Sequence, residues 1–187
     1  MIAAAPLLGP DTGGTEVSLL LSGSIDKPHL KNLFCKFGPL VVEVSSFQVL
    51  SSSQAIQIVC VAPPRAGPQD VPIHISLDGN LFSISGAAFH YHAPLFISSI
   101  TPYDVSVPLA GGVAITATLE EGGDYGNLFG PRFDRDLITI PAACFFGQVK
   151  VMAESFDPDS REIVCIAPAV RRAQWMELRV SLDSQVW

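Results

Sequence analysis

Ile58-Val59-Cys60-Val61-Ala62-Pro63 occurs twice in the chain, the second time as Ile163-Val164-Cys165-Ile166-Ala167-Pro168. The two copies are 105 residues apart, and Ser76-Leu77-Asp78 returns as Ser181-Leu182-Asp183 after the same interval. A fixed offset between matching landmarks indicates an internal repeat. The 187 residues are therefore predicted to form two copies of one unit.

Composition and charge exclude two classes of function. Hydrophobic residues make up 48% of the chain, but no stretch approaches the ~18 consecutive apolar residues of a membrane helix. The first eight residues have no basic segment and too short an apolar run for a signal peptide. The net charge is −7, and neither half has the basic surplus of a nucleic-acid binder. We expect no membrane insertion by this segment and no nucleic-acid partner.

Alternating apolar residues predict a strand near the start of each unit. Val17, Leu19 and Leu21 alternate with largely polar residues after Gly13-Gly14, and the same pattern follows Gly111-Gly112. Period two is typical of a half-buried strand, and glycine pairs permit a sharp chain reversal. No Gly-x-Gly-x-x-Gly or Walker pattern follows either pair, so no nucleotide site is predicted.

Short strands separated by turn signals fill the rest of the first unit. The pattern predicts strands over 32–37, 40–50, 55–61, 73–77 and 81–91. From residue 94 the plan repeats, and no amphipathic helix is predicted. Many short strands with regular turns imply antiparallel sandwiches. The boundary is placed at Ala93-Pro94, which gives domains 1–93 and 94–187.

The two units differ in two places. The interval from the glycine pair to the first cysteine is 22 residues in one unit and 33 in the other, and the extra residues are expected to project as a polar surface loop. The first unit continues from Asp78 to His92, whereas the second stops at Trp187, four residues after Asp183. We therefore expect the second unit to lack its closing strand.

The ordered landmarks resemble the IPT/TIG family, immunoglobulin-like domains shared by plexins and transcription factors. The matching elements are the opening Gly13-Gly14-Thr15, Cys-x-Phe-Gly, Ile-x-Cys-x-x-Pro, the Ser-x-Asp-Gly strand end and the closing Phe89-x-Tyr91. The resemblance covers nearly the whole chain. It implies an all-β fold of two tandem immunoglobulin-like antiparallel β-sandwiches. Two positions depart from the pattern: valine follows Gly112, and Ser184 replaces the hairpin glycine.

The resemblance also gives the cysteines a role. In extracellular members such as plexins, Cys35–Cys60 and Cys144–Cys165 would be structural disulfides. Four cysteines allow three connectivities, and the repeat favours the one in which each unit closes on itself. Closing a loop of about 25 residues stabilises a fold by roughly 3 kcal/mol. Buried reduced thiols are the alternative, because free cysteine packs as a small hydrophobe.

The remaining candidate residues give little indication of a metal site or a catalytic site. His90 and His92 share one strand face and could form half a zinc site, but without a third ligand we expect outward, solvated histidines. The acidic loop over 120–136 could offer calcium ligands, although its spacing matches no EF-hand, and a solvated loop is favoured. Its acidic residues are Glu120, Glu121, Asp124, Asp134 and Asp136. No catalytic motif is present, so no catalytic, cofactor or metal residue is assigned.

These features favour a non-catalytic module of a larger cell-surface or secreted protein. It would act as a spacer or recognise a protein partner, or neighbouring domains of the same chain. One alternative is an intracellular Rel-like module for dimerisation or DNA binding, and the acidic charge speaks against it. Another is an accessory domain of a carbohydrate-active enzyme, which would need exposed aromatic residues on one face; Trp175 and Trp187 are the only tryptophans.

Overall fold

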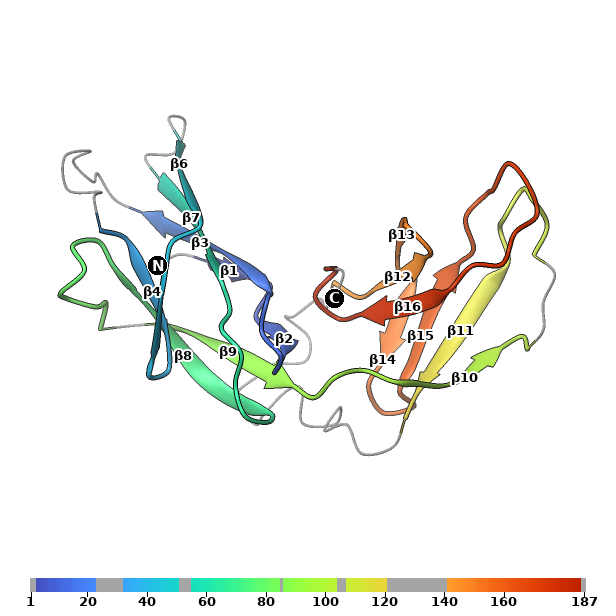
Figure 1. Cartoon of the computed structure of the whole chain (residues 1–187), viewed down its shortest axis with the longest axis horizontal. Coiled ribbons are helices and arrows are strands. Elements are labelled where there is room, and N and C mark those ends of the chain that lie inside the picture. Colours follow the sequence, from blue (N-terminus) through green and yellow to red (C-terminus); the bar gives the residue numbers. More distant parts are fainter. Residues whose placement is uncertain are drawn as a thin grey trace. The chain divides into compact units, whose positions relative to one another are not determined.

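The computed structural model describes residues 3–22, 32–50, 55–84, 86–103, 107–120 and 141–185. The chain divides into two compact units, Met1–His92 (unit 1) and Ala93–Trp187 (unit 2) (Figure 1). Every regular element in the described ranges is a strand, which confirms the predicted all-β fold class. Within the same ranges there is no helix with the length and apolar character needed to span a bilayer.

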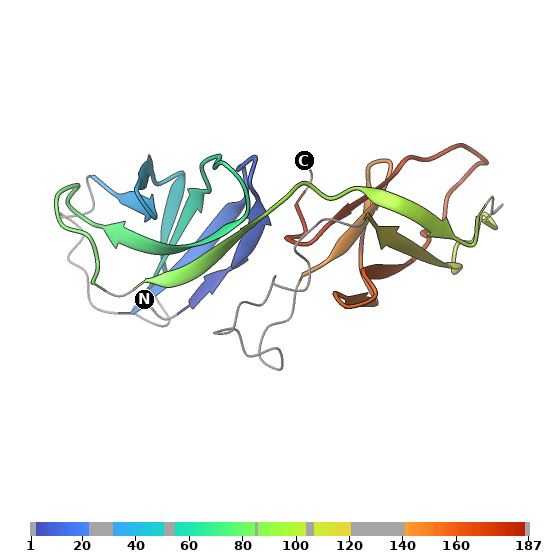
Figure 2. The ribbon, with the colours of Figure 1, turned by 90° about the horizontal axis from the view of Figure 1, so that it is seen from below.

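Unit 1 is a sandwich of two sheets (Figures 1 and 2). The first sheet has the order β1-β3-β7-β6 and is antiparallel throughout. Its strands are β1 (Ala3–Ala5), β3 (Glu16–Ser22), β7 (Ala55–Val61) and β6 (Ser46–Leu50). The second sheet has the order β2-β9-β8-β4-β5. Its strands are β2 (Leu8–Pro10), β9 (Ala87–His92), β8 (Gln69–Ser76), β4 (Phe34–Phe37) and β5 (Leu40–Glu43). All its pairs are antiparallel except β2 with β9.

The sequence pattern does not predict where the chain of unit 1 changes sheets. β1 and β2 lie in different sheets, with the cis peptide bond Ala5-Pro6 between them. Three-residue strands are too short to show alternation. The strand predicted over 40–50 is in fact two, because the chain crosses between sheets at Val44-Ser45. The strand predicted over 81–91 begins only at Ala87, after a longer connection from β8.

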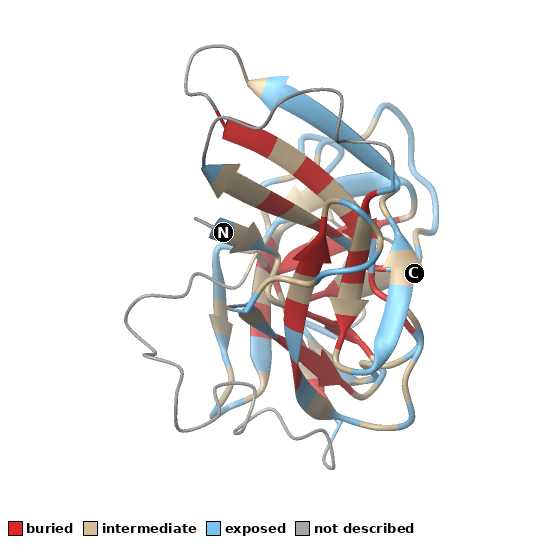
Figure 3. Cartoon of the chain, turned by 90° about the vertical axis from the view of Figure 1, so that its left-hand side faces the viewer, coloured by how far each residue is buried: buried red, intermediate tan, exposed pale blue. Residues whose placement is uncertain are grey.

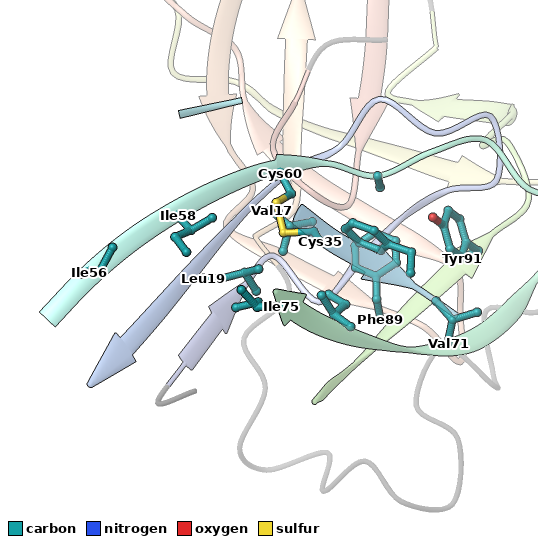
Figure 4. Packing of buried hydrophobic residues seen from close by; sticks show 13 residues of the cluster. Val17, Leu19, Cys35, Ile56, Ile58, Cys60, Val71, Ile75, Phe89 and Tyr91 are labelled. Carbon is teal, nitrogen blue, oxygen red and sulfur yellow. A yellow bond between two sulfur atoms is a disulfide. The ribbon is translucent and has the colours of Figure 1, made fainter. Parts of the chain in front are cut away.

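Alternation places the core of unit 1 between its sheets (Figure 4). Val17 and Leu19 of β3 have no exposed surface, and neither do Phe89 and Tyr91 of β9. The ring of Phe89 stands edge-to-face against Phe37 and Tyr91, with centroid distances of 5.5 and 4.9 Å. This confirms the prediction that the closing strand fills the core of the first sandwich with its two aromatic rings.

Unit 2 repeats most of this plan. One sheet has the order β10-β11-β15-β14 and the other the order β13-β12-β16. The strands of the first are β10 (Ile97–Thr101), β11 (Ala114–Leu119), β15 (Glu162–Ile166) and β14 (Ser155–Asp157). Those of the second are β13 (Val149–Met152), β12 (Ala143–Phe146) and β16 (Leu178–Ser181). In the described part of this unit no strand pairs with the outer side of β16, where β9 lies beside β8 in unit 1. Within the described residues, β16 is therefore the last strand on this side of its sheet.

Candidate functional site

A disulfide links the two sheets in each unit. Cys35 of β4 is bonded to Cys60 of β7 (Figure 4), and Cys144 of β12 is bonded to Cys165 of β15. The Cα–Cα distances are 6.4 and 6.2 Å, within the usual range of about 4.4–6.8 Å. All four residues are completely buried. The described part of the chain contains no free cysteine, so the cysteines cross-link the sandwiches and offer no exposed thiol.

The glycine pairs are needed for backbone packing. Gly13 and Gly111 have φ of 77° and 70°, in the left-handed region that favours glycine. A Cβ on Gly13 would lie 2.8 Å from the carbonyl oxygen of Ala62, and one on Gly111 would lie 2.6 Å from that of Ala167. The next amide in each unit, of Gly14 or Gly112, donates a hydrogen bond to the same carbonyl oxygen. Each pair therefore packs closely against the end of its repeated Ile-Val-Cys stretch, at Ala62 in unit 1 and at Ala167 in unit 2.

The repeated Ser-Leu-Asp segment caps the end of a strand. Oδ1 of Asp78 accepts hydrogen bonds from the hydroxyl of Ser76 at 3.0 Å and from the amides of Asn80 and Leu81 at 2.9 Å each. The amide of Leu81 is the largest cause of a lowered pKa of the Asp78 carboxyl, followed by the amide of Asn80 and the Ser76 hydroxyl. Donors directed at the ionised carboxylate stabilise its charged form.

Unit 2 builds the same cap. The hydroxyl of Ser181 donates to Oδ1 of Asp183 at 2.5 Å, and the amide of Gln185 donates to the same oxygen at 3.0 Å. The residue that follows the aspartate differs between the units, as the sequence indicates. It is Gly79 in unit 1, with a φ of 80°, and Ser184 in unit 2, with a φ of 64°. The sequence shows that these serine and aspartate residues are repeated, but it does not indicate their capping role.

The expectation that the two histidines of β9 are solvated is wrong. They point away from Phe89 and Tyr91, as predicted, but both are buried, each with a residue exposure of 6%. Nδ1 of His90 lies 2.6 Å from Oδ1 of Asp70 on β8. The sequence pattern predicts no strand over 8–10, whereas β2 pairs with β9 and sets the buried Leu8 next to His90. Among the described residues, no group of three potential ligands could hold a metal ion.

The acidic loop lies largely outside the described residues. Glu120 is described and exposed, while Glu121, Asp124, Asp134 and Asp136 are not described. Trp187 also falls outside the described ranges. Trp175 is described and is 97% exposed.

Comparison with known proteins adds evidence on the fold. No family model matches the chain, and neither does any curated protein. Among solved structures, the chain is similar to the full extracellular region of plexin A4, with 17% sequence identity and a TM-score of 0.51. The match covers 97% of this chain and 16% of the plexin chain. At this identity the likeness is one of fold: the chain has the immunoglobulin-like, all-β fold of part of a plexin ectodomain.

Proposed function

We propose that the chain is a tandem IPT/TIG-type module of a larger cell-surface or secreted protein. It is non-catalytic and serves as a spacer or as a binding surface for a protein partner or neighbouring domains. The observation that carries the proposal is the duplicated inter-sheet disulfide, Cys35–Cys60 and Cys144–Cys165, inside two sandwiches of one design. The plexin-like fold supports the same assignment.

The disulfides bear on the question of which cellular compartment the protein occupies. Disulfides persist in oxidising environments such as the cell exterior and are rare in the cytosol and nucleus. All four sulfurs belong to residues without exposed surface, where a reductant reaches them poorly. A protein that keeps both bonds in each molecule is therefore expected to reach the cell surface or the medium. The acidic net charge of −7 also disfavours the Rel-like, DNA-associated alternative.

Thiol titration of the full chain tests the proposal. The protein is isolated from its native source, with free thiols blocked at lysis, and then denatured without reductant. We expect no free thiol, and peptide mapping should recover the Cys35–Cys60 and Cys144–Cys165 pairs. A parallel sample reduced before blocking serves as the control and should give four thiols. Four thiols in the unreduced sample would overturn the extracellular assignment and favour an intracellular module.

The carbohydrate-binding alternative is tested separately. Its best support is the exposed indole of Trp175, since such domains bind sugars on exposed aromatic side chains. We expect no retention of the full chain on immobilised polysaccharides. Retention that disappears in Trp175→Ala, while the fold is kept, would replace the protein-recognition proposal with this alternative.

A further inference from the structure

Strand β6 is an exposed apolar edge of unit 1. It is the last strand of the sheet β1-β3-β7-β6, so within the described residues its side away from β7 pairs with no strand. Phe47 and Val49 are 48% and 39% exposed. They stand opposite Ile58 and Ile56 of β7, which are buried. Figure 3 shows β6 as exposed over most of its length, beside the alternating buried positions of β7.

The corresponding edge of unit 2 provides an internal comparison. β14 occupies the same place in its sheet but has only three residues, Ser155–Asp157. Acidic residues lie in and around it, namely Glu154, Asp157 and Asp159. Short length and charge are how natural sheets prevent edge-to-edge association. β6 has five residues, Ser46–Leu50, and none of them is charged. The chain thus protects one edge and leaves its counterpart available for pairing.

The residues of β6 are suited to pairing with a second β6 strand that runs in the opposite direction. If two copies pair antiparallel around a two-fold axis at Gln48, Phe47 of one chain lies opposite Val49 of the other, and Gln48 lies opposite Gln48. Aromatic residues opposite β-branched residues form favourable cross-strand pairs. No like charges meet across this pairing, although the chain carries a net charge of −7. A second copy of this chain is therefore the occupant that β6 fits.

We propose that β6 is a homodimerisation edge, at which Ser46–Leu50 pairs antiparallel with the same strand of a second copy. Two four-stranded sheets then become one continuous sheet across an isologous interface. The proposal does not depend on the function proposed above. One pair of five-residue strands is small compared with standard protein interfaces, so the dimer dissociates on dilution.

Sedimentation of the full chain over a range of concentrations tests the dimer. We expect a reversible monomer–dimer equilibrium for the wild type. Phe47→Lys and Val49→Lys should each abolish the dimer at every concentration at which the wild type forms it, because charged edge residues disfavour pairing. Val149→Lys is the matched control, since Val149 is 42% exposed on β13 of unit 2, and it should dimerise like the wild type. A wild type that stays monomeric overturns the proposal, even if β6 binds an extended peptide of another protein.

Single cysteines test the register of the pairing. In Gln48→Cys the two introduced thiols face each other across the axis. Facing residues of antiparallel strands have Cα atoms about 4.5–5.5 Å apart, which a disulfide spans. We expect mild oxidation to cross-link Gln48→Cys but not Ser46→Cys, whose facing residue is Leu50. Peptide mapping of the native disulfides verifies the fold of both variants. Equal cross-linking of the two variants, or a dimer that cross-links in neither, contradicts the pairing.

Discussion

The hydroxyl of Tyr91 donates a hydrogen bond of 2.9 Å to the carbonyl oxygen of Pro63. This contact joins the closing strand of unit 1 to the end of the first Ile58–Pro63 stretch. The ring of Tyr91 is fully buried, and burial raises the pKa of its phenol to about 12. The last strand of the unit therefore contributes both an apolar ring to the core and a hydrogen bond to a loop carbonyl.

Tyr91→Phe isolates the hydrogen bond from the packing. The variant keeps the ring but removes the donor, so we expect the free energy of unfolding to fall by about 1 kcal/mol. Tyr103→Phe is the matched control, because Tyr103 is 91% exposed, and it should have no measurable effect. Denaturant unfolding of both full-length variants gives the comparison. Equal stability of Tyr91→Phe and the wild type would mean that the contact contributes nothing net.

The raised pKa of Tyr91 predicts how unit 1 responds to alkaline pH. A phenol that titrates near 10 when unfolded and at about 12 when folded binds its proton more tightly in the native state. Its contribution to stability is therefore complete below pH 10 and is lost as the pH rises through 12. Tyr91→Phe should show a smaller loss of stability over this range. Parallel slopes for the two proteins in unfolding measured from pH 9 to 12 would contradict the assignment.

The disulfides give a prediction that separates the units. The double variant Cys35→Ala/Cys60→Ala should destabilise unit 1 by about 3 kcal/mol, the amount typical of closing a loop of this length. Residues 1–92 contain no tryptophan, so tryptophan fluorescence reports unit 2, while far-ultraviolet circular dichroism reports both units. We expect an earlier circular-dichroism transition with an unchanged fluorescence transition.

The reciprocal variant Cys144→Ala/Cys165→Ala is the control for that experiment. It should lower the transition seen by fluorescence. If removing the Cys35–Cys60 bond shifts the fluorescence transition equally, the two units do not unfold independently.

Local patterns predict the fold well where the constraint is local. The alternation through Val17 and Leu19 identifies a strand with one buried face, and the sharp turn needed at Gly13 is visible as a glycine pair. The positions at which the chain changes sheets are not predicted. The signal for the crossing at Val44-Ser45 is a shift of the alternation by one residue, which is easily taken for a single continuous strand, and β2 is too short to show any alternation. The burial of His90 is not predicted either, because it depends on pairing with β2, a strand that is distant in sequence. The edge character of β6 emerges only from the order of strands in the sheet.

The Asp78 cap predicts a sensitivity to acid. Its lowered pKa, caused first by the amide of Leu81 and next by that of Asn80, means that the folded state holds the carboxylate in its charged form. The contribution to stability is complete above the ordinary pKa of 3.8 and is lost as the pH falls through the lower, folded value. Asp78→Asn should therefore be less stable than the wild type at neutral pH, and the difference should shrink below pH 4. A difference that does not change with pH, measured by denaturant unfolding, would exclude the carboxylate charge as the cause.

The position after each cap gives a reciprocal pair of substitutions. Ser184 adopts a φ of 64°, a conformation that costs a residue with a Cβ roughly 1–2 kcal/mol, whereas its counterpart Gly79 adopts a φ of 80° without that cost. Ser184→Gly should stabilise unit 2 by at most about 1 kcal/mol, because the added freedom of glycine in the unfolded chain offsets part of the gain. Gly79→Ala should destabilise unit 1, since its Cβ would also meet the ring of Phe34 at 3.3 Å.

Thermal melting followed by tryptophan fluorescence for unit 2 and by circular dichroism for both units measures this pair. Gly67→Ala is the control for Gly79→Ala: it has a φ of 76° and no atom within 4 Å of the added Cβ. It should therefore show the backbone cost without the steric one. If Ser184→Gly lowers the melting temperature of unit 2, then the hydrogen bond from the Ser184 hydroxyl to Sδ of Met152, at 3.4 Å, outweighs the cost of the left-handed backbone.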